Sequence, residues 1–215
     1  MTLQRTRIKV CGVTRREDAD VAVAAGADAI GVIFAPSPRQ VTLAQAVAAL
    51  AGVPPLVARV GVFVDATLDE IEAAILACGL TAVQFSGAES PSACRAVSRP
   101  VIKAVRVGTD FGSECAEPYR GYAAALLLDT YVTGKAGGTS QTFDWQRAGE
   151  CPGWASVFVA GGLNPSNVSA CIAALRPYAV DVSSGVEERP GIKDHDKVRA
   201  FCAAVRTADR GVSSE

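Results

Sequence analysis

Short apolar runs alternate with helical patterns along the whole chain. The runs are rich in Val, Ile, Leu and Ala, and they occupy residues 7–13, 29–34, 57–64, 82–85, 101–107, 124–129, 156–160 and 179–183. They are nearly continuous instead of alternating between apolar and polar residues. That pattern is typical of strands that are covered on both faces in a parallel sheet.

Eight strand–helix units in 215 residues predict a single α/β domain over residues 1–215, folded as a closed (β/α)8 TIM barrel. An open, doubly wound sheet is the alternative architecture. No Gly-x-Gly-x-x-Gly follows the first strand, which argues against dinucleotide binding. No linker or change of composition divides the chain.

Helix starts are marked by capping residues. Thr14-x-x-Glu17 and Thr67-x-x-Glu70 both read as capping boxes, and Asn164-Pro165 reads as a cap with the first helical residue. We expect the last helix to run from Asp194 to about Arg206. A Gly-rich loop over 133–142 precedes a helix that is predicted to begin at Phe143.

Charge and hydropathy exclude several classes of partner. The net charge is −1 with Lys and Arg scattered, so we expect no nucleic-acid partner and no attraction to an anionic membrane. No apolar run reaches the roughly 18 residues of a membrane span, and no apolar signal core follows the N-terminal Met1. These features predict a cytoplasmic protein.

Cysteine and histidine usage argues against metal and disulfide sites. The seven cysteines form no Cys-x-x-Cys pair, and their odd number argues against a disulfide framework. The single histidine, His195, excludes a site that needs two imidazoles, and its charged surroundings predict a surface position. No cluster of acids and histidines has metal-ligand spacing, so we expect no metal site.

In a parallel barrel, chemistry lies at the carboxyl ends of the strands. Cys11 follows the first strand, and Asp129 ends the sixth. As structural residues they would be core filler and a loop cap. Their positions favour a catalytic pair, because a thiol with a pKa of about 8.5 and a carboxyl group on opposite sides of the mouth can remove a proton at one atom and deliver it at another.

Further strand-end residues predict the binding of an anionic substrate. Glycine- and serine-rich loops follow the seventh and eighth strands, and their backbone amides can hold a phosphate. Arg39, in a loop stiffened by prolines, can hold a carboxylate or a phosphate. Gln84 and Asp181 are candidate substrate contacts, whereas Glu187 is expected to be exposed or capping. The candidate phosphate residues are Gly161, Gly162, Ser183, Ser184 and Gly185.

Several of these stretches together resemble the phosphoribosylanthranilate isomerase family of tryptophan biosynthesis. The resemblance covers nearly the whole chain and keeps the order and spacing of the motifs. It is carried by Lys-Val-Cys-Gly-Val-Thr at 9–14, Gly-Ala-Asp-Ala-Ile-Gly-Val-Ile-Phe at 26–34, Ser-Pro-Arg at 37–39, Leu-Leu-Asp at 127–129, Gly-Gly-Thr at 137–139, Ala-Gly-Gly-Leu at 160–163, Asp-Val-Ser-Ser-Gly-Val-Glu at 181–187 and Gly-Ile-Lys-Asp at 191–194.

The resemblance implies a (β/α)8 barrel that needs no cofactor and acts on a small phosphosugar, as a monomer or homodimer. It implies an Amadori rearrangement of N-(5-phosphoribosyl)anthranilate to 1-(2-carboxyphenylamino)-1-deoxyribulose 5-phosphate. Asp129 would be the general acid and Cys11 the general base. Arg39 would hold the anthranilate carboxylate, and the backbone around Gly162 and Ser184-Gly185 would hold the phosphate.

Two positions depart from the family pattern. Ser86 stands where the family usually has histidine, and Ser140 stands where it usually has glycine. These changes bear on pocket shape and turnover more than on reaction type.

Two other functions are alternatives to this isomerase. One is a related phosphosugar isomerase, such as that of the histidine pathway, and the other is a catalytically silent barrel that only binds a phosphorylated metabolite.

Overall fold

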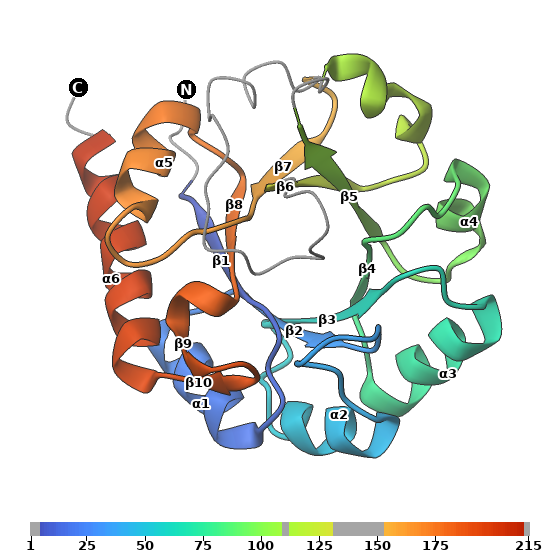
Figure 1. Ribbon diagram of the computed structural model, residues 1–215, viewed down its shortest axis with the longest axis horizontal. Helices are drawn as coiled ribbons and strands as arrows, with labels where there is room; N and C mark the ends of the chain where they lie inside the picture. The colour runs from blue at the N-terminus through green and yellow to red at the C-terminus, as the bar shows by residue number, and fades with distance from the viewer. Residues whose placement is uncertain (1–4, 109–111, 131–152, 213–215) are drawn as a thin grey trace.

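The computed structural model describes residues 5–108, 112–130 and 153–212. Within these ranges, eight parallel strands close into a barrel in chain order, and β8 pairs with β1 (Figure 1). The predicted fold class is therefore confirmed. The strands are β1 (Arg7–Val10), β2 (Ala29–Ile33), β3 (Ala58–Phe63), β4 (Ala82–Phe85), β5 (Val101–Val107), β6 (Ala125–Thr130), β7 (Ser156–Val159) and β8 (Ala179–Val182).

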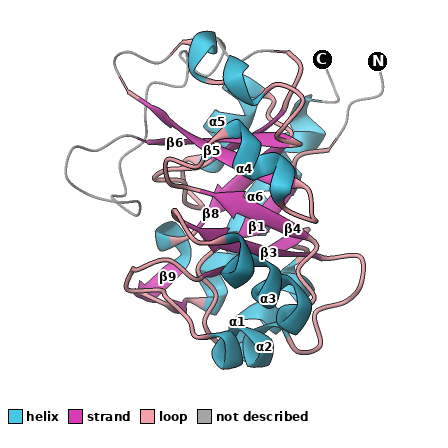
Figure 2. Ribbon diagram, turned by 90° about the vertical axis from the view of Figure 1, so that its right-hand side faces the viewer, coloured by secondary structure: helices cyan, strands magenta, loops and turns pink. Residues whose placement is uncertain are grey.

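The helices surround the barrel. In Figure 2 the strands cross the middle of the molecule and helices lie above and below them. The short hairpin of β9 (Glu187–Arg189) and β10 (Ile192–Lys193) was not predicted. The α-helices are α1 (Arg16–Ala25), α2 (Leu43–Leu50), α3 (Leu68–Cys78), α4 (Pro91–Ala96), α5 (Val168–Leu175) and α6 (His195–Val212), and 3₁₀ turns occupy Ser113–Cys115, Glu117–Tyr119 and Ser184–Val186.

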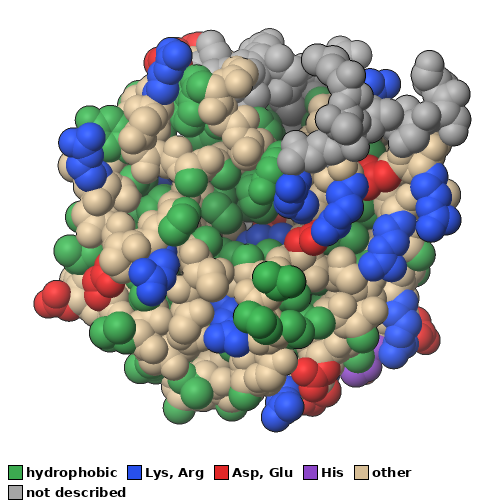
Figure 3. Space-filling view, turned by 180° about the vertical axis from the view of Figure 1, so that it is seen from behind, with side chains coloured by type: hydrophobic (Ala, Val, Ile, Leu, Met, Phe, Trp, Pro, Cys, Tyr) green, Lys and Arg blue, Asp and Glu red, His purple; other side chains and the backbone are tan. Residues whose placement is uncertain are grey.

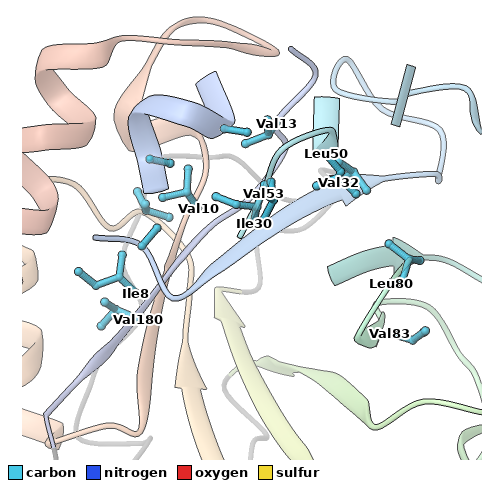
Figure 4. Packing of buried hydrophobic residues seen from close by; sticks show 14 of the residues in the cluster. Ile8, Val10, Val13, Ile30, Val32, Leu50, Val53, Leu80, Val83 and Val180 are labelled. Atoms are coloured by element: carbon cyan, nitrogen blue, oxygen red, sulfur yellow. The ribbon is translucent and has the colours of Figure 1, made fainter. Parts of the chain in front are cut away.

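Apolar side chains on the outer faces of the strands pack against the helices. Ile30 and Val32 of β2 lie beside Leu50 and Val53 from the end of α2 and the loop that follows it (Figure 4). Each fully buried Val, Ile or Leu contributes about 1.5–3 kcal/mol relative to an exposed one. This layer explains why the strands read as continuous apolar runs.

The barrel interior holds a second, smaller apolar cluster. Its buried members are Ala29, Val60, Ile102, Ala125, Leu127, Phe158, Ala160 and Ala179. Because successive side chains of a strand point to opposite faces, the next inward positions toward the carboxyl end fall two residues further on. On β6 that residue is Asp129, and on β8 it is Asp181. The polar candidates therefore lie above an apolar floor.

One predicted capping box is confirmed and the other is wrong. The Thr67 hydroxyl accepts the backbone N–H of Glu70 at 3.3 Å, and the Glu70 side chain accepts the N–H of Thr67 at 2.9 Å. At Thr14, the hydroxyl instead donates to the carbonyl of Gly191 at 2.6 Å. The N-cap of α1 is Arg15, whose side chain makes no capping bond. The tertiary contact to the hairpin outcompetes the local cap.

Two other helix boundaries differ from the prediction. α5 begins at Val168 instead of Pro165, because the Asn164 side chain accepts the backbone N–H of Ser166 in a turn. α6 continues to Val212, six residues beyond the predicted end. The predicted loop over 133–142 and the helix from Phe143 lie outside the described residues.

Six described cysteines are free thiols, and Cys115 is the exposed one among them. Cys151 lies outside the described residues. Within the described ranges, we find no helix with both the length and the apolar character needed to cross a bilayer.

Candidate active site

A cavity of about 640 Å³ opens at the carboxyl ends of the strands. The structure brings nine of the ten predicted site residues to its wall. The tenth, Gly185, lies behind the wall: a methyl group there would come within 1.9 Å of the Leu163 carbonyl oxygen. Glycine thus allows the loop after β8 to pack on the loop after β7. The nine lining residues are Cys11, Arg39, Gln84, Asp129, Gly161, Gly162, Asp181, Ser183 and Ser184.

Cys11 is held at the inner edge of this cavity, next to a glycine on β2. Its backbone N–H donates to the Val182 carbonyl at 2.8 Å, and the residue is only 5% exposed. A methyl group at Gly31 would lie 2.8 Å from the Cys11 sulfur and 3.3 Å from the Cε atom of Lys9. The glycine therefore provides the space that the thiol and the lysine side chain occupy.

Lys9 and Asp181 form a buried ion pair beside the thiol. The Lys9 Nζ atom donates to Asp181 Oδ2 at 2.8 Å, across the β1–β8 register. Burial alone would lower the pKa of Lys9, but Asp181 and Cys11 raise it to about 12. Burial raises the pKa of the Cys11 thiol, and the Lys9 charge and hydrogen bond partly oppose that rise. Lys9 thus supplies positive charge where a thiolate would form.

Asp129 faces the cavity from the end of β6. It is half-buried and stands in register with Arg106 of β5. On the shorter way around the closed barrel, β7 and β8 lie between its strand and β1, which precedes Cys11. The carboxyl group and the thiol therefore enter the cavity from different sides.

Arg39 is held by Glu187, which corrects the expectation for that glutamate. The Arg39 Nε and Nη2 atoms donate to Glu187 Oε1 and Oε2 at 2.8 and 2.7 Å. The Glu187 side chain is only 4% exposed, so the predicted exposed or capping role is wrong. Burial would raise the pKa of Glu187, but Arg39 and Lys193 hold it below its ordinary value.

The loop after β7 is fixed by side-chain amides. The Asn164 and Asn167 Nδ2 atoms donate to the Gly162 carbonyl oxygen at 3.3 and 3.0 Å. Because that carbonyl is already bonded, the loop has a defined course next to the turn Ser184–Val186. Backbone amides in such paired loops can hold an anion.

Three buried side-chain atoms in the described part of the chain have no hydrogen-bond partner, and all belong to cavity-lining residues. They are Gln84 Oε1, Asp181 Oδ1 and Ser183 Oγ. Buried polar atoms are normally paired. Their convergence on one cavity indicates a polar ligand.

Known proteins resemble this chain over nearly its full length. The family model described as N-(5'phosphoribosyl)anthranilate (PRA) isomerase matches residues 8–204. A Pseudomonas fluorescens (strain SBW25) protein named N-(5'-phosphoribosyl)anthranilate isomerase is 50% identical over 210 residues, covering 96% of this chain and 98% of the relative. The chain belongs to the PRA isomerase family. The resemblance seen in the sequence is therefore confirmed.

Solved PRA isomerases share the fold over nearly their full length. Monomers generated from the dimeric enzyme of Thermotoga maritima align with a TM-score of 0.82 at 37% identity, over 94% of this chain and 99% of that one. A PRA isomerase in complex with reduced 1-(o-carboxyphenylamino)-1-deoxyribulose 5-phosphate aligns with a TM-score of 0.79, at the same identity and coverage.

One position that departs from the PRA isomerase pattern contacts a candidate ligand residue. The Gln84 Nε2 atom donates to Ser86 Oγ at 3.1 Å, and both residues line the cavity. The serine therefore orients the Gln84 amide at the end of β4. The second departure, Ser140, and the motif at 137–139 lie outside the described residues.

Sequence reasoning missed the charged residues that hold the site together. Lys9 could have been found, because it precedes Cys11 by two residues and so shares the inner face of its strand. Lys103 donates to Glu89 Oε2 and to the Gly87 carbonyl, both at 2.7 Å, and this joins β5 to the loop after β4. No sequence pattern marked that pair.

The single histidine is also more engaged than predicted. His195 Nε2 lies 2.9 Å from Asp18 Oδ1, and its side chain is 36% exposed. The ring lies at the surface, as predicted, and it also bridges α6 and α1. Among the described residues, no group of His, Cys, Asp or Glu side chains could hold a metal ion.

Proposed function

We propose that this chain catalyses the Amadori rearrangement of N-(5-phosphoribosyl)anthranilate to 1-(2-carboxyphenylamino)-1-deoxyribulose 5-phosphate, a step of tryptophan biosynthesis. Its membership of the PRA isomerase family supports this reaction. The single observation that carries the mechanism is one cavity that joins Cys11, Asp129 and Arg39 to the loops after β7 and β8.

The cavity suits a substrate with an anion at each end. The loops at Gly161-Gly162 and Ser183–Gly185 would bind the terminal phosphate through backbone amides. Arg39 would bind the anthranilate carboxylate, because a guanidinium forms directed hydrogen bonds to such a group. The unpaired acceptors Gln84 Oε1 and Asp181 Oδ1 would receive sugar hydroxyls.

Asp129 is the proposed general acid. Its protonated carboxyl group would deliver a proton to the furanose ring oxygen as the bond from that oxygen to C1′ breaks. The nitrogen lone pair would form an iminium at the opened C1′. A positioned acid or base contributes about 10²–10⁴-fold to such steps.

Cys11 is the proposed general base. Its thiolate would remove the C2′ proton, and the C–H electron pair would form an enolamine that neutralises the iminium. Protonation at C1′ and loss of the 2′-hydroxyl proton would then give the ketone. The Lys9 charge beside the sulfur supports this role, because it favours the thiolate.

The test is an assay of purified protein with freshly made N-(5-phosphoribosyl)anthranilate, following the loss of anthranilate-type fluorescence. We expect saturable turnover and formation of the ribulose product. A second reaction mixture would contain the phosphosugar substrate of the histidine-pathway isomerase. Turnover of that substrate alone would contradict the proposal, and binding without turnover of either compound would favour a silent barrel.

A further inference from the structure

The β9–β10 hairpin lies outside the barrel but reaches two parts of the site. It contributes Glu187 and Lys193, whose side chains are 4% and 0% exposed, and they form a direct ion pair at 2.9 Å. The Lys197 Nζ atom donates to the Glu187 carbonyl at 3.0 Å, which ties the hairpin to α6. The hairpin is therefore firmly anchored.

Glu187 fixes the orientation of the Arg39 guanidinium. Its two oxygens engage the Nε and Nη2 atoms of Arg39, and Oε1 also accepts from Lys193 Nζ and from the Gly191 N–H at 3.3 Å. This bidentate pairing leaves the Nη1 edge of Arg39 for another partner. Arg39 also lines the cavity, so that edge can serve a substrate carboxylate.

Lys193 connects the same carboxylate to the loop after β8. Besides bonding Glu187, its Nζ atom donates to the Ser183 carbonyl at 3.1 Å. Arg39 and Ser183 meet again at Gly12, where a methyl group would lie 2.6 Å from Arg39 Cδ and 2.9 Å from Ser183 Oγ. The two anion-binding parts are thus linked through one buried cluster next to Cys11.

The cluster also retains positive charge. Glu187 pairs with two cationic groups, Arg39 and Lys193, so one of them is in excess. Burial lowers the pKa of Lys193, and the charge and hydrogen bond of Glu187 oppose that fall. A buried pair that only stabilised the fold would not need contact with both ligand-binding parts. The observed contacts run to Arg39 and to the phosphate loop.

We propose that Glu187 and Lys193 are positioning residues that fix Arg39 relative to the Ser183–Gly185 loop. They would thereby set the spacing between carboxylate and phosphate that the site accepts. This inference rests on the proposed function, because it assigns the two anion sites to one substrate. Glu187 and Lys193 act through Arg39 and Ser183 and touch no reacting atom.

The test is a double-mutant cycle of Glu187→Gln and Arg39→Ala, with Glu188→Gln as the control. Glu188 is the exposed neighbouring carboxylate on the same hairpin, so its substitution makes the same charge change. Glu187→Gln should raise KM about 10-fold with a smaller change in kcat, since coupling within a charged network is typically of this size. In the Arg39→Ala background the same substitution should change KM less than about 2-fold. The proposal would be overturned if Glu187→Gln changed KM by the same factor with and without Arg39, or if it left KM unchanged in the wild type.

Binding of the reduced product, measured by titration calorimetry, separates this inference from the proposed function. If the wild type binds that ligand without turnover, the proposed reaction fails, whereas the cycle can still be measured through Kd. If Glu187→Gln does not fold, Glu187→Asp takes its place in the cycle. Glu187→Asp keeps the charge but shortens the side chain. It should raise KM or Kd when Arg39 is present and should leave them unchanged in Arg39→Ala.

Discussion

Cys11 is a buried thiol whose pKa depends on the charged neighbours Lys9 and Asp181. Burial and the Asp181 charge raise its pKa, and Lys9 opposes them. The sequence predicts Cys11 as a site residue from its position alone, because it follows the first strand. Its environment could not be predicted, since the Lys9–Asp181 pair beside it joins residues 172 positions apart along the chain.

The raised pKa predicts how the Cys11 thiol titrates. The mechanism needs a protonated Asp129 together with a Cys11 thiolate, so the titration of the thiol is measured apart from turnover. Cys11 should ionise above the ordinary thiol pKa of about 8.5. The ultraviolet absorbance of thiolate in the wild type minus that in Cys11→Ser, followed against pH, would measure this ionisation. Ionisation at or below the ordinary thiol pKa would contradict the environment described for Cys11.

Arg39 predicts a different kinetic signature. Arg39→Ala should raise KM for N-(5-phosphoribosyl)anthranilate by roughly 10-fold or more and change kcat less, because a charged hydrogen bond to the bound carboxylate is lost. Arg39→Lys keeps the charge without the bidentate geometry, so its KM should lie between those of the wild type and Arg39→Ala. An unchanged KM in Arg39→Ala would remove the carboxylate-binding role.

At the scale of elements, strand alternation explains the predictable part of the site. Inward positions on β6 and β8 carry Asp129 and Asp181, and the residue following β1 is Cys11. The hairpin of β9 and β10 could not be predicted, because strands of three and two residues carry no periodic pattern. Its contacts also explain why the Thr14 hydroxyl bonds the Gly191 carbonyl instead of capping α1.

A substitution at Gly31 on β2 tests whether the packing of the strands fixes the position of the Cys11 thiol. Gly31→Ala would place a methyl group 2.8 Å from the Cys11 sulfur. We expect turnover to fall about 10-fold or more and stability to fall by about 1–3 kcal/mol, the usual cost of overpacking. Gly153→Ala, where the space is open, is the matched control. Wild-type turnover in Gly31→Ala would show that the sulfur need not stay where it is.

At the scale of the whole molecule, buried charges join distant parts of the chain around a predictable apolar core. Asp18 of α1 is fully buried and accepts hydrogen bonds from Arg15, His195 and the Lys193 backbone, which connects α1 with the hairpin and α6. The closed barrel followed from the apolar runs. These links did not, because they depend on side chains far apart in sequence. On the face seen in Figure 3, basic side chains are interspersed with acidic and apolar ones.

Asp18 predicts how stability depends on pH. Burial would raise its pKa, but hydrogen bonds from Arg15 and His195 hold it below the ordinary value. Its contribution is therefore present above the unfolded-state pKa of about 3.9 and is lost as pH falls through the lower folded-state value. Asp18→Asn should lower the free energy of unfolding at neutral pH by about 1–3 kcal/mol and flatten its decline in acid. Urea unfolding at several pH values measures both effects.

The control for this prediction lies on the same helix. Asp20 is exposed, and Asp20→Asn should change the free energy of unfolding by less than about 1 kcal/mol. Equal effects of the two substitutions would contradict the role given to Asp18.

The central claim is that a thiol after β1 and a carboxyl group on β6 share one reaction at the barrel mouth. The most direct measurement is kcat for N-(5-phosphoribosyl)anthranilate in Cys11→Ser and Asp129→Asn, with Cys115→Ser as the control. Cys115 also lines the cavity, but it is exposed and has no assigned role. We predict that each of the first two variants loses at least about 10²-fold in kcat while the control keeps wild-type turnover. Near-wild-type kcat in either Cys11→Ser or Asp129→Asn would contradict the account.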